Sequence, residues 1–106
     1  MKYYVFTFSQ RIRLINYLFD LARKQRFQQD RLLVRESLND KYSEAMLTDI
    51  LDSVLEILDE ESRRIMVNDF KMKSDKQWWQ HFYSRSTYYR LKTKATEEFL
   101  DYLHAK

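Results

Sequence analysis

The segment DKQWWQHFYSRSTYYRLKTKATEEFL, residues 75–100, decides the fold that the rest of the chain must support. It begins with bulky aromatic residues and continues as an amphipathic stretch rich in arginine and lysine. We predict a short aromatic helix, a tight turn at Ser84 and a longer helix over about residues 85–103, with the Ser84 hydroxyl as the N-cap. A short helix that buries bulky residues can hold a second helix at a fixed angle, as in a helix-turn-helix DNA reader.

Helical spacing separates an inner face from an outer face in this pair of helices. We expect the inner residues to pack the two helices together as the motif core: Trp78, Trp79, Phe82, Tyr88, Leu91 and Ala95. The residues that face elsewhere are polar: Arg85, Ser86, Tyr89, Arg90, Thr93 and Lys94. Arginine can contact guanine through two hydrogen bonds, while Ser, Thr, Tyr and Lys suit phosphates. The first turn of the longer helix, residues 85–87, would enter the major groove.

The composition excludes several kinds of site. Glycine and proline are absent, which excludes glycine-rich phosphate loops and favours helices joined by short polar turns. We therefore predict an all-α fold, a compact bundle of about five or six helices in a single domain over residues 1–106. Cysteine is absent too, and His81 and His104 lack acidic neighbours at ligand spacing, so we predict no metal site and no cofactor.

The domain divides into an N-terminal helical platform, residues 1–42, and the part that contains the helix-turn-helix, residues 43–106. Apolar residues follow a helical period from Gln10 to about Phe27, with Ser9 as a plausible N-cap. The positions expected to face the core are Ile12, Ile15, Leu18, Phe19 and Ala22. The next segment, 28–42, is either a second helix capped by Asp30 or a continuation of the first. Two further helices are expected, one opened by Ser43 and ending near Leu58, the other from about Glu60 to Phe70.

Charge is distributed unevenly along the chain. The net charge is +6 over residues 1–35, −8 over residues 36–61 and +6 over residues 71–94. This alternation indicates internal complementarity or separate faces for separate partners, although solvated helix faces of differing sign would produce the same pattern. No apolar run approaches the ~18 residues needed to span a bilayer. We expect a cytoplasmic protein without a membrane association.

The stretch YSRSTYYRLKTKA, residues 83–95, resembles the recognition-helix segment of region 4 of sigma-70-type factors. It is more similar still to phage-encoded ArpU-type late transcription regulators, in which a Ser-x-x-Thr turn, a buried position, Tyr-Arg and a downstream Ala recur. The resemblance covers roughly residues 46–103. It implies burial of Tyr88 and Leu91 and assigns DNA contact to five residues, which are Arg85, Ser86, Thr87, Tyr89 and Arg90.

These observations predict a sequence-specific regulator of transcription that binds double-stranded DNA through the helix over about 85–103. The resemblance makes RNA polymerase a candidate partner, with the acidic region 43–61 as its docking surface. A homodimer would supply the affinity that one recognition helix lacks. The alternative is a protein–protein adaptor on a degenerate helix-turn-helix, since the turn lacks glycine and Trp78 or Trp79 replaces the expected small residue. No catalytic constellation is present, so we predict no enzymatic activity.

Overall fold

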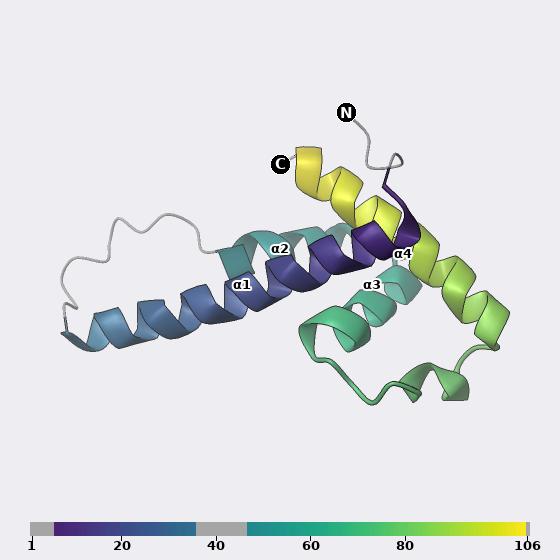
Figure 1. Cartoon of the computed structure of the whole chain (residues 1–106), viewed down its shortest axis with the longest axis horizontal. Coiled ribbons are helices and arrows are strands. Elements are labelled where there is room, and N and C mark those ends of the chain that lie inside the picture. The colour runs from purple at the N-terminus through teal and green to yellow at the C-terminus, as the bar shows by residue number, and fades with distance from the viewer. Residues whose placement is uncertain (1–5, 36–46, 106) are drawn as a thin grey trace.

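The computed structural model describes residues 6–35 and 47–105, and every regular element in these ranges is helical (Figure 1). The α-helices are α1 (Phe8–Arg35), α2 (Leu47–Ile57), α3 (Glu60–Met66) and α4 (Arg85–Ala105). A π turn, η3 (Val67–Lys71), prolongs α3, and a 3-10 helix, η4 (Trp78–His81), precedes α4. The all-α prediction is confirmed, whereas the described residues form four α-helices rather than the five or six that we expected.

Helix α1 is longer than the first helix expected from the sequence. It runs without a break to Arg35, so residues 28–35 continue it and do not form a second helix capped by Asp30. Its N-cap is Thr7 rather than Ser9, because Thr7 Oγ1 accepts a hydrogen bond from Gln10 N at 3.1 Å and Gln10 Oε1 accepts one from Thr7 N at 2.9 Å. This reciprocal pair is a capping box.

Helices α2 and α3 meet at a tight corner that polar groups close. Asp59 is the N-cap of α3 and accepts a hydrogen bond from Ser62 N at 2.8 Å. Glu60 and Glu61 follow in the first turn, where the helix dipole favours negative charge. The predicted start of the helix that ends near Leu58, at Ser43, lies outside the described residues. Arg63 donates hydrogen bonds to three carbonyl groups at the end of α2, so the corner satisfies groups that a helix terminus leaves unpaired.

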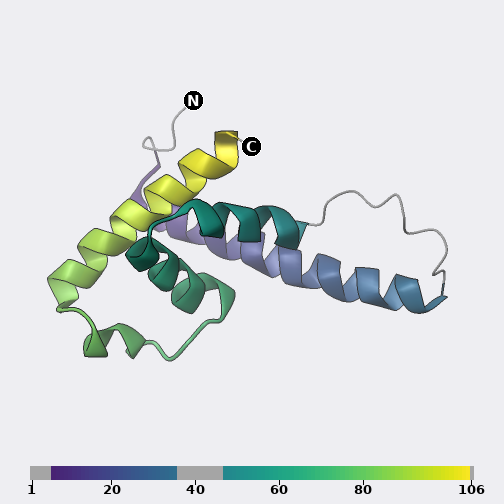
Figure 2. The same cartoon turned by 180° about the vertical axis from the view of Figure 1, so that it is seen from behind.

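The hydrophobic core lies where all four α-helices meet. Phe19 of α1 is its centre, with its ring 6.5 Å from that of Phe70 in η3 and 5.8 Å from that of Phe99 in α4. Other buried members come from each α-helix: Ile15, Ala22, Leu51, Val54, Leu55, Met66, Ala95 and Leu100. In both views α2 lies along α1, and α4 crosses the N-terminal half of α1 (Figures 1 and 2). This crossing leaves the N-terminal end of α4 outside the core.

The connection from Met72 to Ser84 differs from the predicted first helix of a helix-turn-helix. Its only regular element is η4, closed by i to i+3 hydrogen bonds such as Phe82 N to Trp79 O at 2.9 Å. So short a segment forms few internal hydrogen bonds, and its conformation depends on contacts with its neighbours. Near the start of the connection, Lys73 has a left-handed φ of 52°, a conformation that glycine usually adopts at a helix end.

Phe82 was predicted to belong to the motif core, but the structure places it at the surface. Its side chain is 56% exposed, and it lies beside the ring of Trp78 with the Arg64 guanidinium 4.8 Å from its ring centre. The prediction assumed an α-helix that would turn Phe82 toward α4, whereas the segment ends its 3-10 turn at His81.

Candidate nucleic-acid interface

The N-terminus of α4 is closed by Ser84, the residue predicted as its cap. Ser84 Oγ accepts a hydrogen bond from Thr87 N at 3.2 Å, and Ser84 O accepts one from Tyr88 N at 2.9 Å. The Ser84 hydroxyl in turn donates to Thr87 Oγ1 at 2.9 Å. These contacts leave the first amides of the helix, on Arg85 and Ser86, outside the intrahelical hydrogen bonds.

Most of the predicted DNA-contacting residues lie on the outer side of α4. Arg85, Ser86 and Arg90 are exposed, Tyr89 is 44% exposed, and Thr87 is half-buried. Within the part of the chain that the structure describes, neither Arg85 nor Arg90 forms a salt bridge. Their guanidinium groups are therefore available to another molecule.

Lys94 differs from the two arginines, because internal carboxylates hold it. Its Nζ lies 2.8 Å from Asp59 Oδ2 and 3.5 Å from Glu98 Oε2. The hydrogen bond from Lys94, together with the Ser62 amide, lowers the pKa of Asp59 to about 2, and the same contact with Asp59 raises the pKa of Lys94. Lys94 thus links α4 to the start of α3.

A cluster of four side chains, the Asp69 cluster, fixes the inner side of α4. Asp69 Oδ1 accepts a hydrogen bond from Trp78 Nε1 at 2.8 Å, and Asp69 Oδ2 accepts one from the Tyr88 hydroxyl. Lys92 Nζ lies 3.1 Å from the same Oδ2 and donates to the Tyr88 hydroxyl at 3.2 Å. Burial, and next the hydrogen bond to Asp69, raise the pKa of Tyr88. The cluster joins η3, η4 and α4.

The predicted motif core is aromatic and centres on Tyr88. The indole of Trp79 stacks on the Tyr88 ring at 4.6 Å with an interplanar angle of 9°, and Trp78 meets the same ring edge-on at 6.2 Å. Tyr88 and Ala95 are buried, while Leu91 and both tryptophans are half-buried. These contacts hold the connection against α4.

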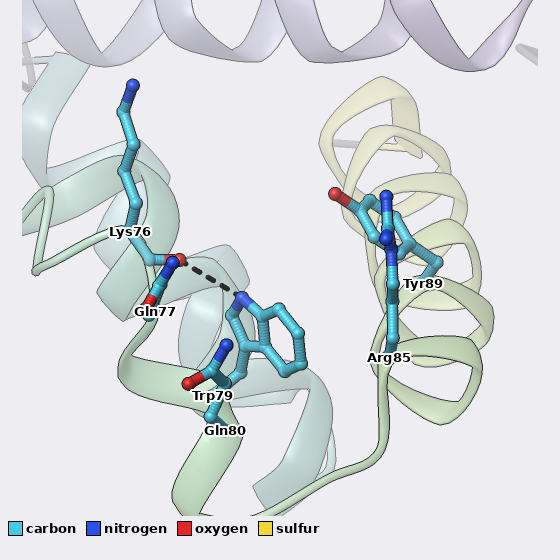
Figure 3. Close-up of a pocket in the computed structure, with 6 residues that line it drawn as sticks. All are labelled: Lys76, Gln77, Trp79, Gln80, Arg85 and Tyr89. Carbon is cyan, nitrogen blue, oxygen red and sulfur yellow. Dashed lines mark hydrogen bonds between the residues drawn. The ribbon is translucent and has the colours of Figure 1, made fainter.

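A groove separates the connection from the outer side of α4 (Figure 3). One hollow of about 560 Å³ is lined by six residues: Lys76, Gln77, Trp79, Gln80, Arg85 and Tyr89. A second, of about 450 Å³, extends toward α1 and shares Lys76, Trp79 and Tyr89 with the first. We call the two together the aromatic groove. In Figure 3, Arg85 and Tyr89 lie on α4 across the hollow from Lys76 and Trp79.

Three residues of this region have roles that the sequence did not indicate. Asp69 and Lys92 anchor α4, and Lys76 borders the groove, but none of them was predicted to have such a role. Asp69 has its tyrosine partner 19 residues away, a separation at which sequence spacing carries no signal. The only sequence signal for this region was the high density of aromatic residues over 78–89.

Metal binding and membrane insertion find no support in residues 6–35 and 47–105. No three His, Cys, Asp or Glu side chains in these ranges are placed to hold a metal ion. No helix in them combines the length and the apolar character needed to cross a bilayer.

Comparisons of this chain with protein-family models, with curated proteins and with solved structures find no match.

Proposed function

We propose that the chain is a sequence-specific DNA-binding regulator of transcription that places the N-terminal half of α4 in the major groove of double-stranded DNA. One observation carries the proposal: Arg85 and Arg90 are exposed and form no salt bridge with any described residue, on a helix whose inner side is fixed. A fixed helix with free guanidinium groups is suited to reading base edges, because each bidentate contact with guanine discriminates by ~1–3 kcal/mol.

The neighbours of the two arginines support the same role. Arg85 and Tyr89 lie one helical turn apart, as do Ser86 and Arg90, so they form two adjacent rows on the outer side. The hydroxyl groups of Ser86 and Tyr89 are suited to phosphate contacts that set the position of the helix. The first amides of α4, at the positive end of its dipole, favour a phosphate too.

The DNA-reading surface consists of a single helix, so we expect the chain to act together with a partner. One recognition helix supplies limited affinity, so useful specificity calls for a second copy of the chain or for RNA polymerase. Exposed carboxylates along α2 and in the first turn of α3 are the candidate polymerase surface: Asp49, Glu56, Glu60 and Glu61. A regulator of this phage-related type would act in the cytoplasm.

A protein–protein adaptor is the second candidate. Two observations favour it: Lys92 and Lys94 are paired with carboxylates of this chain, and the element before α4 is a 3-10 helix rather than an α-helix. An adaptor would be retained on DNA weakly and without sequence preference, whereas a DNA reader combines steep salt dependence with one preferred sequence.

The test is selection from a random-sequence duplex pool at moderate salt, with sequencing of the enriched molecules. We expect the wild-type protein to converge on one motif and the Arg85→Ala, Arg90→Ala double variant to lose it. The matched control is Arg13→Ala, Arg26→Ala, which removes the same charge from exposed positions of α1 and should keep the motif. Absence of any motif, or a motif that the first double variant keeps, would favour the adaptor.

A further inference from the structure

The aromatic groove lies beside the proposed duplex-reading surface but is not explained by it. Lys76, Gln77 and Gln80 border the groove from the connection, on the side opposite α4 (Figure 3). Arg85 and Tyr89 complete it from α4, whereas Arg90 lies outside it. The groove thus shares Arg85 and Tyr89 with the duplex-reading surface, whereas its residues on the connection are not part of that surface.

The walls of the groove are aromatic and held in place. Tyr88 covers one face of the Trp79 indole at 4.6 Å, and the Trp79 Nε1–H donates to Lys76 O at 3.0 Å. Tyr88 itself is fixed by Asp69, and its ring lies 4.9 Å from that of Tyr89. A flat ring entering the groove would therefore meet aromatic surface that is already ordered.

The positive charge of the groove lies in the first hollow, which Lys76 and Arg85 border. Lys73 and Lys92 border the second hollow, where they are paired with Asp20 and Asp69. The carboxylate that lines the second hollow, Asp69, accepts two hydrogen bonds and pairs with Lys92, so it is already neutralised. An anion would find Lys76 and Arg85 on opposite sides of the first hollow, and among the described residues neither forms a salt bridge.

The hydrogen-bonding groups of the first hollow match the edge of a nucleobase. The side-chain amides of Gln77 and Gln80 each offer both a donor and an acceptor. The aromatic walls can stack on a flat ring, and the two cations can bind a phosphate. The two amides can form hydrogen bonds with the polar edge of the ring. This combination is characteristic of sites that bind single-stranded nucleic acid by stacking.

We propose that the aromatic groove binds a nucleotide whose base is unpaired, with the base against Trp79 and Tyr89 and its phosphate between Lys76 and Arg85. The nucleotide can come from two sources, a free mononucleotide or one unit of a single strand. The second hollow continues the groove past the first and would take a neighbouring unit of a strand. Because Arg85 borders the groove and also belongs to the duplex-reading surface, the two ligands should compete.

Isothermal titration calorimetry on the full chain tests the proposal with three probes: adenosine monophosphate, a thymidine hexanucleotide and inorganic phosphate. We expect both nucleotide probes to bind at least about tenfold more tightly than phosphate, because only they can stack on the aromatic walls. A hexanucleotide that binds much more tightly than the mononucleotide identifies a strand as the ligand, and equal affinities identify a free nucleotide. Both outcomes support the proposal that the aromatic groove binds a nucleotide.

Variants locate the binding site. Lys76→Ala should weaken nucleotide binding by about tenfold, whereas Lys24→Ala, an equal loss of charge at an exposed position of α1, should leave it unchanged. Trp79→Leu should also weaken it, with circular dichroism to show that the variant is folded. Nucleotides that bind no better than phosphate, or equal weakening by Lys24→Ala, would overturn the proposal.

Discussion

The two halves of α4 are held in place by different kinds of interaction. From Ala95 onward the helix is anchored by apolar packing, with Phe99 and Leu100 fully buried in the core that α4 shares with α1 and α2. From Arg85 to Lys94 it is anchored by the Asp69 cluster, the Trp79 stack and the Lys94–Asp59 contact. One half of the helix thus belongs to the core, and the other projects beyond it.

The difference shows how one helix can both stabilise the fold and hold exposed side chains in a fixed orientation. Apolar packing is non-directional and contributes most of the free energy of folding. Hydrogen bonds contribute little net free energy but are directional, so contacts of Tyr88 and Lys92 with Asp69 set the rotation of α4 about its axis. That rotation keeps Arg85 and Arg90 on the outer side.

Truncation in the apolar half should have the largest effect. Phe99→Ala removes a fully buried ring from the centre of the core and should lower the free energy of unfolding by about 3–5 kcal/mol. Urea denaturation followed by circular dichroism measures this loss. Tyr102→Ala, at a position 39% exposed on the same helix, should change it by less than about 0.5 kcal/mol. Similar losses in both variants would contradict apolar burial as the anchor of this half of α4.

Removal of the central carboxylate of the polar half should have an intermediate effect. Asp69→Ala leaves Lys92, whose side chain is 15% exposed, without its partner, and should cost about 1–3 kcal/mol of unfolding free energy. Adding Lys92→Met removes the unpaired charge and should recover part of that loss, which a double-mutant cycle quantifies. The exposed Asp49→Ala is the control. A loss as large as that of Phe99→Ala would mean that the two halves contribute equally to stability.

The smallest effect should come from the contact that ends the polar half. The pKa of Asp59 is lowered to about 2, chiefly by the hydrogen bond from Lys94, so its charged form stabilises the folded state above pH 3.8. This contribution is lost as the pH falls from 3.8 toward 2, and since the pair is about half exposed it should amount to less than about 1 kcal/mol.

Unfolding curves of wild type and Asp59→Asn between neutral pH and pH 2 measure this contribution. Asparagine keeps an oxygen to cap α3 but loses the charge, so the difference between the two proteins should disappear at the acid end. Lys94→Ala should reduce the difference at neutral pH. A difference that is independent of pH would show that the Asp59 charge has no part in it.

The sequence predictions were accurate for features that depend on neighbouring residues and failed for features that depend on distant parts of the chain. Helical periodicity correctly indicated burial of Ile15, Phe19 and Ala22, because the interval between core positions is a local property. It failed for Phe82, whose exposure depends on whether a short segment becomes an α-helix or a 3-10 turn. Periodicity also left residues 28–35 ambiguous, since a polar stretch can either continue a helix or interrupt it.

The sequence by itself determined that this chain is helical, because a chain without glycine and proline that has apolar residues at helical spacing has few other ways to bury them. It also indicated which residues of the basic helix are polar and which are apolar. Only the tertiary structure decided which cations remain free. Lys92 and Lys94 are paired with carboxylates brought close by folding, whereas Arg85 and Arg90 form no salt bridge with any described residue. Charge pairing over such separations depends on how helices cross, and residue spacing does not encode that crossing.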